Sequence, residues 1–216
     1  MKKLMTLGFM ASALMVPVLA NAATADLKLI GTITPAACVP NFTGGATIDY
    51  GNIPASTLNS AAQTLLPEKT TKFAVTCNAP VKFAIALTDG RSASALTTLD
   101  TIATYTPDQK FGLGTASNGA KIGAYSLQMS NEVPDSGTAR RLMSTNDGAT
   151  WADFGGGIRT GVLIGFTAVG TSLTPAAYKS MIVDVRVVAA IDKSSNLPIT
   201  NDIKIDGLST IEVKYL

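Results

Sequence analysis

The sequence predicts an all-β protein built as one β-sandwich. Segments with apolar residues at every second position recur at short spacing along the chain. Stretches rich in Gly, Pro and Asn separate these segments, and no segment shows the 3.6-residue period of a long amphipathic helix. There is no internal repeat, low-complexity tract or linker. We therefore expect a single sandwich domain.

A secretory leader is expected before this domain. Lys2 and Lys3 give a charged start, residues 4–18 are almost wholly apolar, and Ala20-Asn21-Ala22 forms a small-x-small cleavage site. We expect a signal peptide over residues 1–22 and a mature domain over residues 23–216. The apolar run is short for a membrane span, so we expect no membrane insertion.

The charge balance argues against two classes of partner. Of 17 basic residues two lie in the leader, which leaves 15 basic against 15 acidic residues in the mature chain. A neutral chain offers no electrostatic attraction to nucleic acid or to an anionic membrane surface. We expect neither as a partner.

The absence of histidine from the sequence limits the catalytic chemistry. It excludes Ser-His-Asp and Cys-His arrangements and His-ligated zinc. The Asp and Glu residues are scattered over turns and solvent-facing strand positions, where solvated surface is the better interpretation. Lys-Ser or paired-carboxylate chemistry remains formally open. We expect no enzymatic activity, metal or cofactor.

The two cysteines, Cys38 and Cys77, are expected to form a disulfide because the leader implies export to an oxidising compartment. Closing a loop of this length should stabilise the fold by roughly 4 kcal/mol through the entropy of the unfolded chain. The alternative is a pair of free buried thiols.

The strands are predicted from the alternation of apolar and polar residues along the chain. We expect them at residues 46–50, 70–77, 81–88, 111–115, 124–130, 140–145, 161–169, 181–191 and 210–216. Residues 78–80 are expected to turn between the second and third of these, and residues 39–45 to form a loop. Asn118-Gly119 is the strongest short hairpin signal, and residues 146–151 predict a further tight turn.

The first stretch of the mature chain, residues 25–38, is expected to be extended and half-buried. Leu27, Leu29 and Gly31 share one face with Ile33, and Cys38 ends the stretch. Gly31 leaves a gap in this apolar row, where another backbone can approach closely.

Trp151 is the one tryptophan in the sequence and a candidate ligand contact. An exposed indole stacks well on a sugar ring, but a core or rim aromatic is the more common role.

Taken together, several motifs resemble the subunits of chaperone–usher pili. They are Gly31-Thr-Ile-Thr-Pro-Ala-Ala-Cys38, residues 48–51, the strand ending in Cys77, and the alternating last strand with Tyr215 next to its end. The resemblance is nearest to a fimbrial-like family of unknown function.

That resemblance implies an immunoglobulin-like, pilin-type sandwich that lacks its last strand. A periplasmic chaperone would lend a strand during export, an outer-membrane usher would assemble the fibre, and another fimbrial subunit's N-terminal extension would then fill the gap. Leu27, Leu29 and Gly31 would belong to the donor strand. Ile211, Val213, Tyr215 and Leu216 would form the chaperone-binding edge. The protein would pass through the periplasm to a surface fimbrium that supports adhesion.

Two departures from the family pattern keep the position in a fibre open. Only residues 23–30 precede Gly31, which is short for a donor extension, and Ile203 stands where the family often has a glycine. A tip, base or terminating position, or a self-contained domain, is therefore also consistent with the sequence. A second hypothesis is a secreted or surface binding module whose loops at residues 92–108 and 131–157 hold a glycan or host ligand.

Overall fold

The computed structural model describes residues 27–32, 37–102, 104–170 and 172–216. The expected signal peptide lies outside these residues. The chain divides into two compact units, residues 1–34 and residues 35–216. In the first unit, residues 27–32 belong to no strand and their side chains are exposed. The fold described below is that of the second unit.

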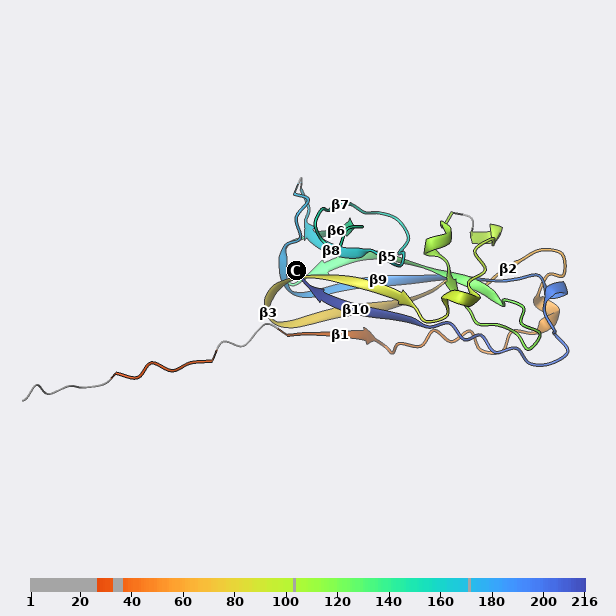
Figure 1. The fold of residues 1–216 in the computed structure, drawn as a ribbon. Helices are drawn as coiled ribbons and strands as arrows, with labels where there is room; N and C mark the ends of the chain where they lie inside the picture. Colours follow the sequence, from red (N-terminus) through yellow and green to blue (C-terminus); the bar gives the residue numbers. More distant parts are fainter. Residues whose placement is uncertain (1–26, 33–36, 103, 171) are drawn as a thin grey trace, which may run out of the picture. The chain divides into compact units, whose positions relative to one another are not determined.

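The prediction of an all-β fold is confirmed (Figure 1). The strands are β1 Cys38–Thr43, β2 Thr64–Leu65, β3 Lys69–Asp89, β4 Phe111–Gly112, β5 Gly123–Pro134, β6 Ala139–Ser144, β7 Ala152–Asp153, β8 Leu163–Ala168, β9 Ala177–Ile191 and β10 Ser209–Tyr215. Short 3₁₀ turns lie at η1 Ala55–Thr57, η2 Ser92–Ser94, η3 Asp100–Ile102, η4 Pro107–Gln109 and η5 Ser194–Asn196. Within the described residues, no helix is long and apolar enough to cross a membrane.

The long strand β3 connects two antiparallel sheets. Its first half pairs with β1 on one side and β9 on the other, and β9 continues to β5 and β4. Its second half pairs with β10 on one side and β8 on the other, and β8 continues to β6 and β7. The short β2 pairs with the end of β9. Both β1 and β10 thus pair with the same strand, β3.

The core lies between the two sheets and follows the predicted alternation. Its buried residues include Phe73, Val75, Phe83, Ile85, Leu87, Ile164, Phe166, Met181, Val183, Val185 and Val187. These side chains come from β3, β8 and β9, where every second residue points to the same face. Both halves of β3 contribute to one continuous hydrophobic cluster.

The predicted turn at residues 78–80 is wrong. Thr76 and Val81 both pair with β9, and the register between them shifts, so β3 runs on through an irregularity instead of reversing. The Asn78 side-chain carbonyl accepts a hydrogen bond from the Ala37 N–H, and the Asn78 backbone N–H donates to the Ala37 carbonyl. Pro80, which has no N–H, is tolerated at such an irregularity.

Two neighbouring expectations are also wrong. Residues 39–45 are not all loop, because β1 extends to Thr43; Pro40 is accommodated since β1 is an edge strand. Residues 46–50 are not a strand. Within the segment expected to be extended and half-buried at residues 25–38, the described residues 27–32 and 37 belong to no strand and are exposed, and β1 begins at Cys38. By contrast, the hairpin at Asn118-Gly119 is confirmed by the bridge between Thr115 and Lys121.

The predicted disulfide is confirmed. Cys38 and Cys77 lie opposite each other in the register of β1 and β3, and their sulfur atoms are bonded. The bond fastens the start of edge strand β1 to the centre of the fold, and Cys77 is fully buried. A disulfide between two elements of one domain is consistent with export.

Removing this bond should destabilise the fold strongly. We expect the double variant C38A/C77A to lose about 4 kcal/mol of unfolding free energy, because its unfolded chain regains the freedom of a loop of 39 residues. Urea unfolding followed by circular dichroism measures this loss. Wild-type protein in a thiol reductant should match the variant; a midpoint unchanged by reduction would contradict the assignment.

Candidate functional site: an open groove between two edge segments

Several strands, β4 and β7 included, have one edge without a partner strand among the described residues, and two of these edge strands meet. These two are β1, which borders one sheet, and β10, which borders the other; each pairs only with β3. At one end the two edges meet, where the Cys38 N–H donates a 2.8 Å hydrogen bond to the Tyr215 hydroxyl. The strands β1 and β10 therefore lie along the same side of the sandwich, each with a free edge among the described residues (Figure 1).

Apolar side chains line this side but are only partly covered. They are Cys38, Phe42, Ile48, Tyr50, Ile53 and Leu58 on the β1 side, and Ile203, Ile205, Ile211 and Val213 on the β10 side. All pack against the buried core, and each is half-buried. In a complete sandwich such a row is covered by a further strand.

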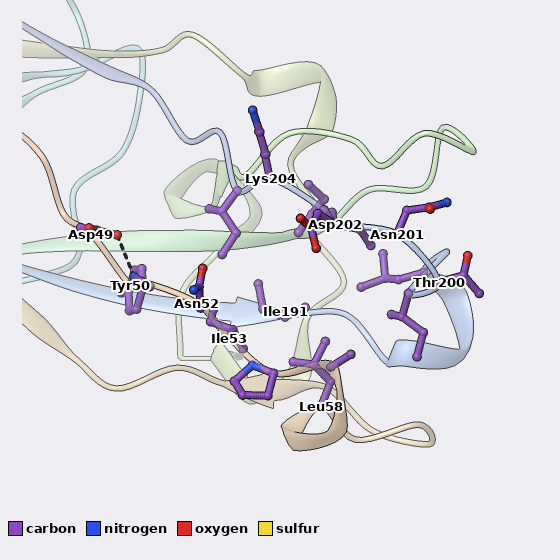
Figure 2. Close-up of a pocket in the computed structure, with 18 of the residues that line it drawn as sticks. Asp49, Tyr50, Asn52, Ile53, Leu58, Ile191, Thr200, Asn201, Asp202 and Lys204 are labelled. Carbon is purple, nitrogen blue, oxygen red and sulfur yellow. Dashed lines mark hydrogen bonds between the residues drawn. The ribbon is translucent and has the colours of Figure 1, made fainter.

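The segments that follow β1 and precede β10 enclose a pocket of about 790 Å³. One wall is formed by residues 48–55 with Leu58, and the other by residues 199–205. Figure 2 shows Ile53 and Leu58 on one side, Asp202 and Lys204 on the other, and Ile191 between them. The pocket and the side shared by β1 and β10 form what we call the groove.

Tyr50 contributes an unsatisfied polar atom to the wall. Its hydroxyl is buried and has no hydrogen-bond partner among the described residues. Burial raises the pKa of this hydroxyl above its ordinary value, and the Lys69 ammonium lies 5.5 Å from the ring centroid. A buried hydroxyl without a partner costs free energy, which an added donor or acceptor would recover.

The backbone of β10 offers a regular set of free groups. Leu216 N–H donates to the Lys82 carbonyl, and Gly90 N–H donates to the Leu208 carbonyl, so the even-numbered residues of β10 face β3. In an antiparallel pair the residues between them point their N–H and C=O groups to the opposite edge. Those residues are Ser209, Ile211, Val213 and Tyr215, and their edge is the one that faces the groove.

Tyr125 fixes the start of β10. Its hydroxyl is hydrogen-bonded to the Ser209 hydroxyl, and its ring lies so close to Gly207 that a Cβ at Gly207 would lie 2.9 Å from it. Gly207 is therefore required for close approach of the chain. Burial raises the pKa of Tyr125 to about 12.

This shift makes the fold sensitive to alkaline pH. The unfolded tyrosine loses its proton near pH 10, whereas the folded one keeps it to about pH 12, so stability falls across this window. We expect a loss of roughly 2 kcal/mol, which pH-dependent urea unfolding would measure. Tyr125→Phe should flatten this fall. A variant that loses stability as steeply as the wild type would refute the role of Tyr125.

The other predicted site residues lie in separate places. Leu27 and Leu29 are each 96% exposed, and Gly31 has no atom near its Cβ position. Ile211 and Val213 face the core side of β10. Tyr215 is 53% exposed and bonds Cys38, and Leu216 lies near the 146–151 turn. The structure thus places Ile211, Val213 and Tyr215 on β10, whereas Leu27, Leu29 and Gly31 belong to the first unit.

Trp151 is half-buried and packs on the fold. A Cβ built on Gly165 of β8 would lie 2.8 Å from the indole and 3.1 Å from Pro175. The turn before it is the expected one, with Asp147 and Gly148 both at positive φ. The Trp151 ring therefore packs directly against the backbone of Gly165, where there is no room for a larger side chain.

Adding a side chain at Gly165 should displace Trp151. We expect Gly165→Val to lower the unfolding free energy by about 1–3 kcal/mol and to shift the tryptophan emission to the red. Urea unfolding followed by fluorescence measures both. Gly155→Ala is the control, since nothing lies within 4 Å of a Cβ there. Unchanged emission from the valine variant would contradict this packing.

Sequence reasoning missed the pocket end of the groove. The residues concerned are Tyr50, Ile53, Leu58 and the segment 199–205. Ile203 and Ile205 continue the apolar alternation of β10, and this pattern indicates that the segment before β10 also faces the core. In the described part of the chain, no group of three or more Cys, Asp or Glu residues is placed to hold a metal ion.

The comparisons with known proteins agree with part of the expectation. Residues 27–126 match the family described as "Protein of unknown function (DUF1120)". Protein GltF of Escherichia coli (strain K12) is 29% identical over 251 aligned residues, which span 100% of this chain and 99% of GltF. The chain is thus similar to a family of unknown function, as the sequence motifs suggested. Neither match names a chaperone–usher fimbrial family.

Proposed function

We propose that the protein is a non-enzymatic fimbrial or fimbrial-like subunit whose groove accepts a β-strand from another protein. The observation that carries the proposal is the free edge of β10 beside a row of half-covered apolar side chains. A strand added there would pair its backbone with residues 209–215 and place alternate side chains against the core.

The partners in this proposal follow from the resemblance in the sequence. A periplasmic chaperone would supply the first strand, an outer-membrane usher would receive the complex, and the N-terminal segment of another subunit would replace the chaperone strand. Leu27 and Leu29 of this chain are exposed and carry the alternation of such a donor segment. The destination would be a surface fimbrium that supports adhesion.

Adding a strand to the groove should be favourable in free energy, through hydrogen bonds and through burial of apolar surface. Each ladder hydrogen bond contributes about 1 kcal/mol, and covering the apolar row removes it from water. An uncovered edge of this kind can pair with unintended chains, and a chaperone strand would prevent that pairing during export.

The alternative of a glycan-binding module has less support. Trp151, its candidate contact, is used in packing against Gly165 and Pro175. That module would also leave the free edge of β10 without a role.

The proposal is tested by co-expression with a cognate periplasmic chaperone. We expect a stable 1:1 complex, lost when residues 211–216 are deleted. Val213→Asp should weaken the complex at least tenfold, because a carboxylate would be buried where the incoming strand covers the core. Glu212→Gln, on the outward face of the same strand, is the matched control.

Two results would count against strand addition. One is a mature protein whose unfolding free energy does not change when the chaperone is added. The other is Val213→Asp binding as tightly as Glu212→Gln. Size-exclusion chromatography and urea unfolding, with and without chaperone, give both readouts.

A further inference from the structure

A second hollow lies beside the groove. It encloses about 590 Å³ and is lined mainly by polar residues, from positions 90–94 and 114–117 together with Asp202, Ile203, Lys204 and Asp206. We call it the polar pocket. Asp202, Ile203 and Lys204 also line the groove. One thin segment of chain therefore forms a wall of both hollows, and we call residues 202–205 the strap.

The strap lines both hollows with the same three residues, Asp202, Ile203 and Lys204. Ile203 and Ile205 pack against the hydrophobic core, whereas Asp206, next in the chain, lines the polar pocket. A shift or rotation of the strap on the groove side must therefore move the wall of the polar pocket.

The strap is weakly held along its length. Within the described residues, no backbone–backbone hydrogen bond involves residues 202–205. Its firm attachment lies just beyond, at Asp206, whose N–H donates to the Leu113 carbonyl at 2.9 Å. The Asp206 carboxylate also pairs with the Arg91 guanidinium at 2.7 Å, and Arg91 lines the polar pocket.

We propose that the strap couples the two hollows, so that a strand entering the groove fixes the wall of the polar pocket. An incoming strand would pair with the unpaired backbone of the strap and cover Ile203 and Ile205. Pairing would restrict the motion of the strap and of its residues Asp202 and Lys204. The Arg91–Asp206 ion pair links the chain next to the strap to Arg91, so the motion of residues 90–94 would be restricted as well. This inference rests on the proposed strand addition. It makes the polar pocket a surface that differs between the free and the complemented protein.

Hydrogen exchange on the mature protein tests this coupling. The probe is a synthetic peptide with the sequence of residues 25–37, whose 13 residues match the 13 from Ile203 to Tyr215. We expect it to slow exchange at residues 202–205 and 209–215, and also by about tenfold at residues 90–94 and 114–117. Residues 135–138, on the turn before β6, should exchange unchanged. A peptide with Leu27→Asp and Leu29→Asp is the inactive control.

The outcomes separate the coupling from the proposed function. Protection of β10 and the strap without any change at residues 90–94 and 114–117 overturns the coupling and leaves strand addition intact. No protection along β10 overturns strand addition and the coupling with it. Arg91→Gln sharpens the test: the peptide should still protect β10, while the protection at residues 90–94 should fall to near that of the free protein.

Discussion

The pairing of β3 with four strands is the interaction on which the rest of the structure depends. Its first half lies between β1 and β9 and its second half between β10 and β8. One continuous strand thereby sets the spacing of both sheets and the position of the core between them. It also leaves β1 and β10 as edges on the same side of the sandwich, since among the described residues each pairs only with β3.

Several contacts fix the positions of β1 and β10 along this side of the sandwich. The Cys38–Cys77 bond fastens β1 to β3, and the Tyr215 hydroxyl bridges from β10 to Cys38. Tyr125 and Gly207 fix where β10 begins. Such anchors lower the conformational entropy that a new strand must remove when it pairs. The pocket end, with Tyr50 and the strap, has fewer restraints.

Much of the fold could be predicted because burial follows alternation. The positions of Phe73, Val75, Phe83 and Ile85 are readable from period two, and so are those along β9. The disulfide followed from the presence of two cysteines behind a leader. The errors at residues 78–80 and 39–45 have one cause: Pro signals a turn in sequence, but an edge strand or an irregularity accommodates it equally well. Whether a strand lies at an edge is not a local property.

The sequence by itself determined the fold class, the core faces of the main strands, the disulfide and the alternation of the last strand. These depend on side-chain period and residue type, which are local. Only the tertiary structure decided that β3 is one strand shared by two sheets, that residues 48–58 and 199–205 face each other across a pocket, and that Trp151 rests on Gly165. These depend on which segments meet in space. Hydrogen-bond pairing between segments far apart in the chain decides this, and no local pattern records it.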